Sequence, residues 1–456
     1  MKVLLVHASI SSCGFNSYGR GDLTESSWIN HGLASISAYL KAKGHKVLLL
    51  DLRLLSGWEE FKDGVKKFSP EIAGISMMSV DFNPVMECVS RLKEVNPSLI
   101  VTVGGPHPTI APEEVLENKL IDHIITGEGE LSFADLIEGL SLGKKQERLI
   151  KGRTPDLDSL PFVDRELYSV KEEPVPLDLP RPFVTIIAGR GCLYNCSFCQ
   201  PAEKKIFGDK VRRRSVANVI SELKTLRFKS MLIHDDCLTE DKQWINDFCR
   251  EYEAAGFKQP FVCQSRADII CRSEEMVKNM RRAGLFCFII GFESGSQRIL
   301  NLLRKGTKIE HNINAAKLCR KYGIRVWANY MLGIPTETKE ETLETVKMLH
   351  EIRPDYYSPA FFTPHPGSDL FDKCVKEGLS LVSSHDEYRR NPFGAKVKGI
   401  DYAFLQDALK ESMKYRKERF LDKVLRQSLV KAAKNRIKRT RVGQMLVTRI
   451  KGFFRY

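Results

Sequence analysis

The 456-residue chain lacks any apolar run of about 18 residues, the length that a helix needs to cross a bilayer. The apolar part of its first residues, MKVLLVHAS, is also shorter than that of a secretory signal, and its pattern predicts a first strand. We therefore expect a protein of the cytoplasm.

Closely spaced cysteines are also absent, with one exception. Most of the twelve cysteines stand alone within strand-like or helical patterns, whereas disulfide frameworks belong to short, cysteine-dense secreted chains. This distribution favours a reducing compartment. The exception is the stretch GRGCLYNCSFC, in which Cys192, Cys196 and Cys199 follow the spacing C-x3-C-x2-C.

Excess charge is nearly missing from the body of the protein. Of 71 lysines and arginines, fifteen lie after residue 410, together with only three of the 57 acidic residues, so +12 of the net charge of +14 belongs to the C-terminal tail. Three interpretations of this tail stay open: a solvated helix with a basic face, a segment lying on an anionic membrane surface, and a nucleic-acid contact. We do not favour nucleic acid, because no strand periodicity follows residue 400.

Strand and helix patterns alternate twice along the chain. In residues 1–145, five βα units predict an α/β domain with a doubly wound, flavodoxin- or Rossmann-like parallel sheet. Residues 146–182 are rich in proline and predict a linker. About six further βα units in residues 183–385 predict a partial (β/α)6 TIM-like barrel, and residues 386–456 predict a helical C-terminal region that ends in the basic tail.

The three close cysteines follow the first predicted barrel strand, FVTIIAG. A structural zinc site takes four ligands, and no second C-x-x-C or C-x-x-C…H-x3-H occurs nearby. A [4Fe–4S] electron carrier also takes four thiolates. Three thiolates leave one iron of such a cluster open for a substrate or cofactor.

The stretch CLYNCSFC resembles the signature of the radical S-adenosylmethionine (SAM) enzymes. The resemblance implies that Cys192, Cys196 and Cys199 hold a [4Fe–4S] cluster, that SAM chelates the open iron, and that its cleavage gives a 5′-deoxyadenosyl radical. Further segments at predicted strand ends, IHDDCLTED, CQSRAD, GFESGSQRILNLLRKGT and MLGIP, resemble the SAM-binding segments of this family. The residues implied to bind SAM are Phe198, Asp235, Asp236, Arg266, Glu293, Ser294, Gly333, Ile334 and Pro335.

The first domain resembles the cobalamin (B12)-binding domain of one large subclass of these enzymes, so the resemblance covers about residues 1–385. It implies that the corrin lies over the carboxyl edge of the sheet, against the loops after the third, fourth and fifth strands. The implied contacts are Ser76, Met78, Ser79, Gly104, Gly105, Pro106, His107, Gly127, Glu128 and Gly129. Small residues suit this role because the backbone must approach a flat macrocycle closely. The sequence lacks the Asp-x-His-x-x-Gly motif whose histidine binds cobalt from below, and His107 is more consistent with a loop residue near the corrin edge.

Together these resemblances imply a cobalamin-dependent methyltransferase that acts on an unactivated carbon. One alternative is a radical SAM cyclase or rearrangement enzyme in which cobalamin serves another role or is absent, and another is a cluster-bearing sensor with a vestigial site. The expected partners are a small-molecule or lipid-linked substrate, an external reductant of the flavodoxin or ferredoxin type, and a membrane surface reached through the basic tail.

Overall fold

The computed structural model describes residues 1–9, 15, 29–168, 178–199 and 201–415. The basic tail beyond residue 415, for which three interpretations were considered, lies outside the described residues. None of the helices in the described ranges combines the length and the apolar character of a membrane span.

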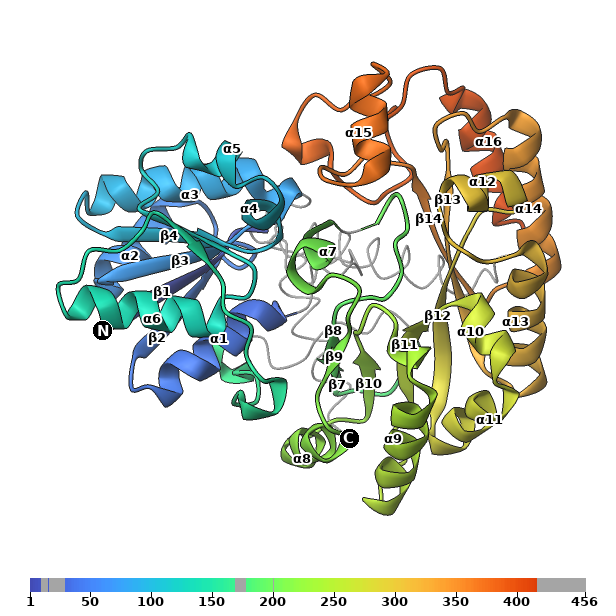
Figure 1. The fold of residues 1–456 in the computed structure, drawn as a ribbon, viewed down its shortest axis with the longest axis horizontal. Helices are drawn as coiled ribbons and strands as arrows, with labels where there is room; N and C mark the ends of the chain where they lie inside the picture. The colour runs from blue at the N-terminus through green and yellow to red at the C-terminus, as the bar shows by residue number, and fades with distance from the viewer. Residues whose placement is uncertain (10–14, 16–28, 169–177, 200, 416–456) are drawn as a thin grey trace, which may run out of the picture.

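The N-terminal part is a six-stranded parallel sheet in the order β2-β1-β3-β4-β5-β6 (Figure 1). Its strands are β1 (Lys2–His7), β2 (Lys46–Asp51), β3 (Ile72–Ser76), β4 (Ile100–Gly104), β5 (His123–Thr126) and β6 (Leu149–Lys151). Buried runs such as VLLV in β1 explain the parallel arrangement, because strands covered on both faces read as continuous apolar segments.

Helices cover both faces of this sheet, as the sequence predicts for a doubly wound fold. On one face, α2 (Trp58–Phe68) and α3 (Phe82–Val95) bury Phe61 and Val89 against the strands. On the other face, α1 (His31–Ala42) and α6 (Glu130–Ser141) bury Leu33 and Phe133. The short helices α4 (Pro106–Ile110) and α5 (Pro112–Leu116) follow β4.

The sixth strand lies within the segment that the sequence assigns to the linker. Residues 149–151 pair in parallel with β5 and so extend the sheet by one strand. Three residues are too short to show a periodic pattern, and the strand is recognised only through its partner.

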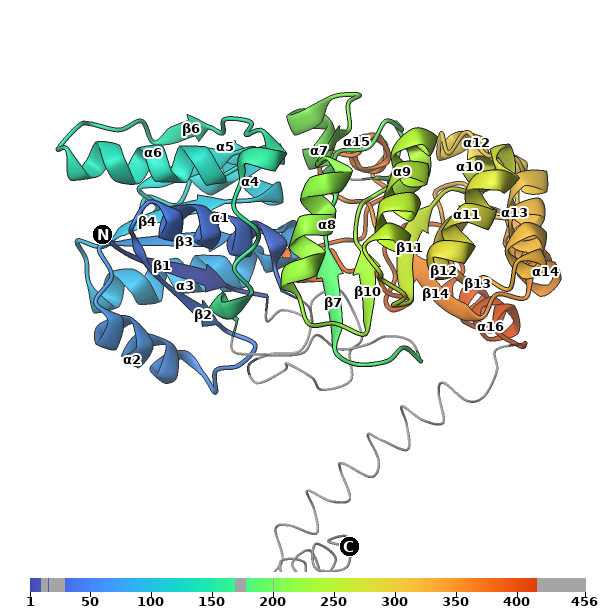
Figure 2. The ribbon, with the colours of Figure 1, turned by 90° about the horizontal axis from the view of Figure 1, so that it is seen from below.

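The second part is a six-stranded parallel sheet, curled into a partial barrel, in the order β7-β10-β11-β12-β13-β14 (Figures 1 and 2). The strands are β7 (Phe183–Ile186), β10 (Ser230–Ile233), β11 (Phe261–Ser265), β12 (Leu285–Glu293), β13 (Arg325–Leu332) and β14 (Tyr356–Phe361). The outer helices are α8 (Val216–Thr225), α9 (Lys242–Ala254), α10 (Ala267–Arg272), α11 (Glu274–Ala283), α12 (Gln297–Leu302), α13 (Ile309–Lys321), α14 (Lys339–Ile352) and α16 (Tyr402–Ser412). The predicted fold class is confirmed in both parts.

The barrel has two apolar cores, one on each side of its sheet. The larger core lies between the strands and the outer helices and includes Phe248, Phe288 and Tyr330. A smaller cluster with Phe183, Leu232, Val262 and Cys287 fills the inner side. Since both faces of the strands are covered, the strand ends have fixed positions on which a site can be built.

A short hairpin connects the barrel to the first domain. Strands β8 (Gly189–Arg190) and β9 (Arg212–Arg213) pair antiparallel beside α7 (Pro201–Phe207). Arg190 forms ion pairs with Glu128 and Glu130 of the first domain, the latter at 2.7 Å, and Arg212 pairs with Glu128 at 2.5 Å. Both carboxylates are buried, and the loop with the three cysteines begins two residues after Arg190. The two domains are therefore joined by charge pairs next to the cysteine loop.

Replacing Arg190 by alanine should loosen this junction. Glu130 would lose its cation and keep neutral donors such as the Ser35 hydroxyl, and a buried carboxylate without its cation costs about 3 kcal/mol or more. We expect a drop of that size in the free energy of unfolding, measured with urea. Arg153→Ala is the matched control, because its pair with Asp135 is about half exposed and exposed pairs contribute about 0–1 kcal/mol. Equal effects of the two substitutions would show that the Arg190–Glu130 pair contributes no more to stability than an exposed ion pair.

Candidate active site

The residues expected to bind the cluster and SAM lie at the carboxyl ends of successive barrel strands. The cysteine loop follows β7 and β8, the Asp235–Asp236 pair follows β10, and Arg266 follows β11. Glu293 ends β12, and Gly333 follows β13. Because the strands are parallel, these ends meet at one edge of the sheet, which is where α/β barrels carry their sites.

The cysteine loop is pinned at Ser197. The Ser197 amide donates to the carbonyl of Leu303 at 2.9 Å, and its hydroxyl donates to the carbonyl of Leu302 at 2.8 Å. Its own carbonyl accepts from the amide of Leu370, at the start of α15 (Asp369–Lys376), at 2.9 Å. The three cysteines beside this anchor remain half-buried or exposed. The loop is thus held by its backbone while its thiols stay accessible to a ligand.

Arg266 connects the third strand end to the cysteine loop. Its guanidinium lies 3.5 Å from the centre of the Tyr194 ring, pairs with Asp268 at 3.0 Å, and donates to the carbonyl of Lys305. Stacking and pairing fix a planar cation beside the loop. This position is consistent with the expected contact to the SAM carboxylate.

Glu293 and Lys305 form a buried ion pair in the same region. Nζ of Lys305 lies 2.9 Å from Oε1 of Glu293, and both side chains are less than a tenth exposed. Burial acts to lower the pKa of Lys305, but the charge of Glu293, and then that of Cys196, hold this pKa above its ordinary value. Lys305 therefore stays a cation, close to the cysteine loop. Lys305 was not predicted as a site residue, although it lies in the segment GFESGSQRILNLLRKGT.

The second oxygen of Glu293 is unused. Oε2 is buried and has no hydrogen-bond partner among the described residues, and such an orphaned atom costs about 1–3 kcal/mol. Glu293 also has a φ of 62°, which is rare for a residue with a side chain. A β-carbon at Gly291 would collide with both Glu293 and Lys305. The local backbone therefore holds Oε2 of Glu293 as an acceptor without a donor. Such an acceptor could take a hydrogen bond from a hydroxyl or amino group of SAM.

The two candidate aspartates differ in their surroundings. Asp235 is buried, accepts from the Ala188 amide at 2.7 Å, and pairs with Arg213 at 3.2 Å. Burial raises the pKa of Asp235 to about 6. Asp236 is half-buried, and within the described residues its carboxylate has no hydrogen-bond or ion-pair partner. Of the two, Asp236 is free to accept from the SAM ammonium, whereas Asp235 joins the end of β10 to β9 and to the segment between β7 and β8.

Substituting these aspartates one at a time should separate the two roles. Asp236→Ala should raise the KM for SAM about tenfold with little change in stability, since one charge-assisted hydrogen bond contributes about 1.5–3 kcal/mol. Asp235→Ala should instead lower the free energy of unfolding by about 2 kcal/mol, because the Ala188 amide loses its acceptor. Steady-state kinetics of 5′-deoxyadenosine formation and urea unfolding measure the two effects. The reverse pattern would exchange the assignments.

The other expected SAM contacts form the apolar and backbone part of the region. Gly333, Ile334 and Pro335 are buried, and the amides of Gly333 and Ile334 donate to Glu337 at 2.6 and 3.2 Å. Phe198 packs against the cluster of buried residues that contains Ile334. Ser294 points elsewhere: its hydroxyl lies 3.2 Å from that of Thr345 and accepts from the Ser296 amide.

The expected cobalamin contacts lie at the carboxyl edge of the first sheet, which faces the cysteine loop. Ser76, Gly104, Gly105 and Gly127 are half-exposed there, and Met78 is 44% exposed. Gly105 has a φ of 109°, and a β-carbon on it would lie 3.0 Å from the Met77 backbone. Accessible backbone of this kind fits a flat macrocycle.

Of the remaining residues of this set, His107 and Glu128 have side-chain partners within the protein. His107 is fully buried, and its Nδ1 lies 3.0 Å from the Ser79 hydroxyl. Glu128 is held by the arginine pair described above, and Gly129 caps α6. Pro106 is exposed at the start of α4.

Comparison with known proteins supports both halves of this arrangement. The B12 binding domain family model matches residues 22–137, and the Radical SAM superfamily model matches residues 186–349. A protein of Pyrococcus horikoshii described as an uncharacterized methyltransferase is 28% identical over 375 residues, 78% of this chain and 81% of the relative. The anaerobic magnesium-protoporphyrin IX monomethyl ester cyclase of Rubrivivax gelatinosus is 27% identical over 402 residues, 82% of this chain and 70% of the relative.

A solved structure shares the fold across both domains. The radical SAM methyltransferase TsrM from Kitasatospora setae, solved with cobalamin and a [4Fe–4S] cluster, superposes with a TM-score of 0.66 at 15% identity. The match covers 91% of this chain and 89% of that structure. With both family models matched and this two-domain fold in place, the chain is a radical SAM enzyme with an N-terminal B12 binding domain, and its cofactors are a [4Fe–4S] cluster, SAM and cobalamin.

Proposed function

We propose that this enzyme is a cobalamin-dependent methyltransferase that acts on an unactivated carbon of a small or lipid-linked substrate. The proposal rests mainly on the contact between the carboxyl edge of the first sheet, where cobalamin is expected, and the segment that carries the cluster cysteines. Glu128, at the carboxyl edge of the first sheet, pairs with Arg190, two residues before Cys192. Lys205 of α7 also donates to the carbonyl of Ile110, which ends α4, at 2.9 Å.

The protein's own residues supply binding, orientation and charge. Cys192, Cys196 and Cys199 would hold the cluster, and Asp236, Arg266 and Glu293 would orient SAM through its ammonium, carboxylate and hydroxyl groups. Lys305 pairs with Glu293 and holds its carboxylate in place. When bound, the cofactors supply the radical and the transferable methyl group, while the protein positions them and excludes water. The half-exposed loops after β3, β4 and β5 would receive the corrin.

Product analysis under strict anaerobiosis tests this reaction class. Protein reconstituted with its cluster should form 5′-deoxyadenosine from SAM and a strong reductant. With cobalamin added, it should also form S-adenosylhomocysteine, because SAM then serves as a methyl source as well. Cobalamin-dependent S-adenosylhomocysteine is the expected result. Formation of 5′-deoxyadenosine alone, whatever the cobalamin supply, would contradict methyl transfer.

The cyclase among the relatives favours one alternative, a radical cyclisation or rearrangement. The same experiment separates the two reactions, since a cyclisation or rearrangement transfers no methyl group and forms no S-adenosylhomocysteine.

For the reductant we propose a flavodoxin or ferredoxin. For the basic tail we propose contact with an anionic membrane surface, on the basis of its mixed basic and apolar composition alone. Sedimentation with anionic and with neutral vesicles, comparing the full chain with one ending at residue 415, tests the tail.

A further inference from the structure

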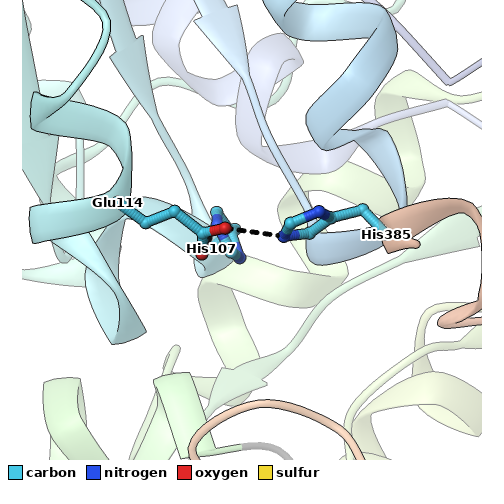
Figure 3. Close-up of side chains that lie close together, drawn as sticks. All are labelled: His107, Glu114 and His385. Atoms are coloured by element: carbon cyan, nitrogen blue, oxygen red, sulfur yellow. Dashed lines mark ion pairs between the residues drawn. The ribbon is translucent and has the colours of Figure 1, made fainter. Parts of the chain in front are cut away.

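Three potential metal ligands from three separate segments meet beside the first sheet (Figure 3). His107 belongs to α4, Glu114 to α5, and His385 to the short 3-10 helix η6 (His385–Glu387), which follows α15. One nitrogen of each imidazole and a carboxylate oxygen lie within 4.8 Å of one another. None of the three belongs to the cluster and SAM region.

Neighbouring side chains hold both imidazoles in this orientation. The Ser79 hydroxyl lies 3.0 Å from Nδ1 of His107, so Nε2 is the nitrogen that faces Glu114. The ring of His385 stacks on Phe82 with centroids 4.1 Å apart and an angle of 15° between the planes. Metal-binding histidines are commonly oriented in this way, by a hydrogen bond to the second ring nitrogen and by packing.

The contacts within the cluster do not satisfy its buried atoms. Nε2 of His107 lies 3.3 Å from Oε2 of Glu114, yet it makes no hydrogen bond within the described part of the chain, although the residue is fully buried. Nε2 of His385 lies 3.0 Å from the other carboxylate oxygen. A buried nitrogen without a partner costs about 1–3 kcal/mol. An ion between the three groups would satisfy it.

The donor set and its spacing suit one class of ion. Two imidazole nitrogens and one carboxylate form a typical zinc ligand set that leaves a fourth position for water. Ligands about 2.0–2.1 Å from a tetrahedral ion lie roughly 3.3 Å apart. Here each imidazole nitrogen lies 3.0 or 3.3 Å from one of the two Glu114 oxygens, and the three donor atoms lie within 4.8 Å of one another. A corrin does not fit between three donors this close together, so the cobalt of cobalamin is not the ion in question.

We propose that His107, Glu114 and His385 bind a divalent ion of the zinc class. The ion connects the segment after α15 to the B12 binding domain. A hydrogen bond already joins these two parts of the protein, since Asn83 of α3 donates to Asp386 of η6 at 3.1 Å. The ion would therefore fix this segment beside the loop after β4, next to the expected corrin edge.

Zinc content measured in four proteins tests the site. The cluster cysteines could also take up zinc, so the comparison includes the variant C192A/C196A/C199A alongside the wild type with its cluster loaded. His385→Ala removes one ligand from a partly exposed position, and His350→Ala is the matched control, because it pairs with Glu411 and its side chain has a similar exposure. We expect about one tightly bound zinc per chain in the wild type, in the cysteine variant and in His350→Ala. His385→Ala should bind zinc more than about 100-fold more weakly.

X-ray absorption on the cysteine variant provides a second readout. Nitrogen and oxygen ligands at about 2.0–2.1 Å, without sulfur, are expected. Absence of zinc after incubation with equimolar Zn²⁺ and desalting would overturn the proposal, and so would full zinc retention by His385→Ala. A corrinoid spectrum altered by His107→Gln in protein without zinc would instead assign His107 to cobalt. Circular dichroism verifies that each variant is folded.

Discussion

Cys196→Ala is expected to abolish both the iron–sulfur absorption and the formation of 5′-deoxyadenosine. Three thiolates are the smallest set expected to hold the cluster here, and the loop that carries them is anchored at Ser197 rather than by a fourth cysteine. We expect a loss of more than about a thousandfold in the rate of SAM cleavage, a size typical of removing a group central to the chemistry. Visible absorption and chromatography of the product measure the two effects.

Cys237→Ala is the matched control for this prediction. Cys237 is 4% exposed and lies near Cys192. Burial raises the pKa of its thiol to about 12, so it stays protonated and makes a poor ligand. The control should keep cluster and activity. If Cys237→Ala lost the cluster while Cys196→Ala kept it, the ligand set would be wrong.

Glu293→Gln is expected to lower the affinity for SAM strongly and to destabilise the fold as well. The substitution removes the charge that compensates Lys305, and an uncompensated buried charge costs about 3–5 kcal/mol. It also weakens the acceptor at Oε2, which has no partner within the protein's described residues. We expect SAM binding to weaken by about 10- to 100-fold, measured by equilibrium binding, alongside a lower unfolding free energy in urea.

The double variant Glu293→Gln/Lys305→Met separates the two effects. Removing both charges should restore much of the stability, because no uncompensated buried charge is then left. SAM binding should remain weak, since a neutral amide still stands in place of the charged acceptor. If the double variant recovered both stability and SAM binding, Glu293 would have only a structural role.

The sequence predicts the fold well because both domains repeat one unit. Apolar strand runs such as EIAGISMMSV and helices ended by glycine are local signals, and parallel topology then follows from their alternation. The same topology brings together at one edge the residues that end successive strands, from the cysteines to Gly333. Strand β6 and the β8–β9 hairpin, with three and two residues per strand, carry no such local signal.

Long-range contacts account for what the sequence did not reveal. Asp235 and Asp236 are equivalent in the pattern, and only the contacts of Asp235 with Ala188 and Arg213 distinguish them. The charge pair of Glu128 with Arg190 and the meeting of His107 with His385 join residues far apart in the chain. Lys305 could have been noticed as a basic residue beside a glycine in the stretch after Glu293, but its burial could not.

The most direct test of the proposed function is the corrinoid content of protein purified without oxygen from cells supplied with cobalamin. The visible spectrum of the extracted cofactor, after removal of the iron–sulfur contribution, gives the ratio of corrinoid to chain. The proposed function predicts about one corrinoid per chain. Protein that carries an intact cluster but no corrinoid would contradict it, and would leave the first domain as a scaffold for a cobalamin-free radical reaction.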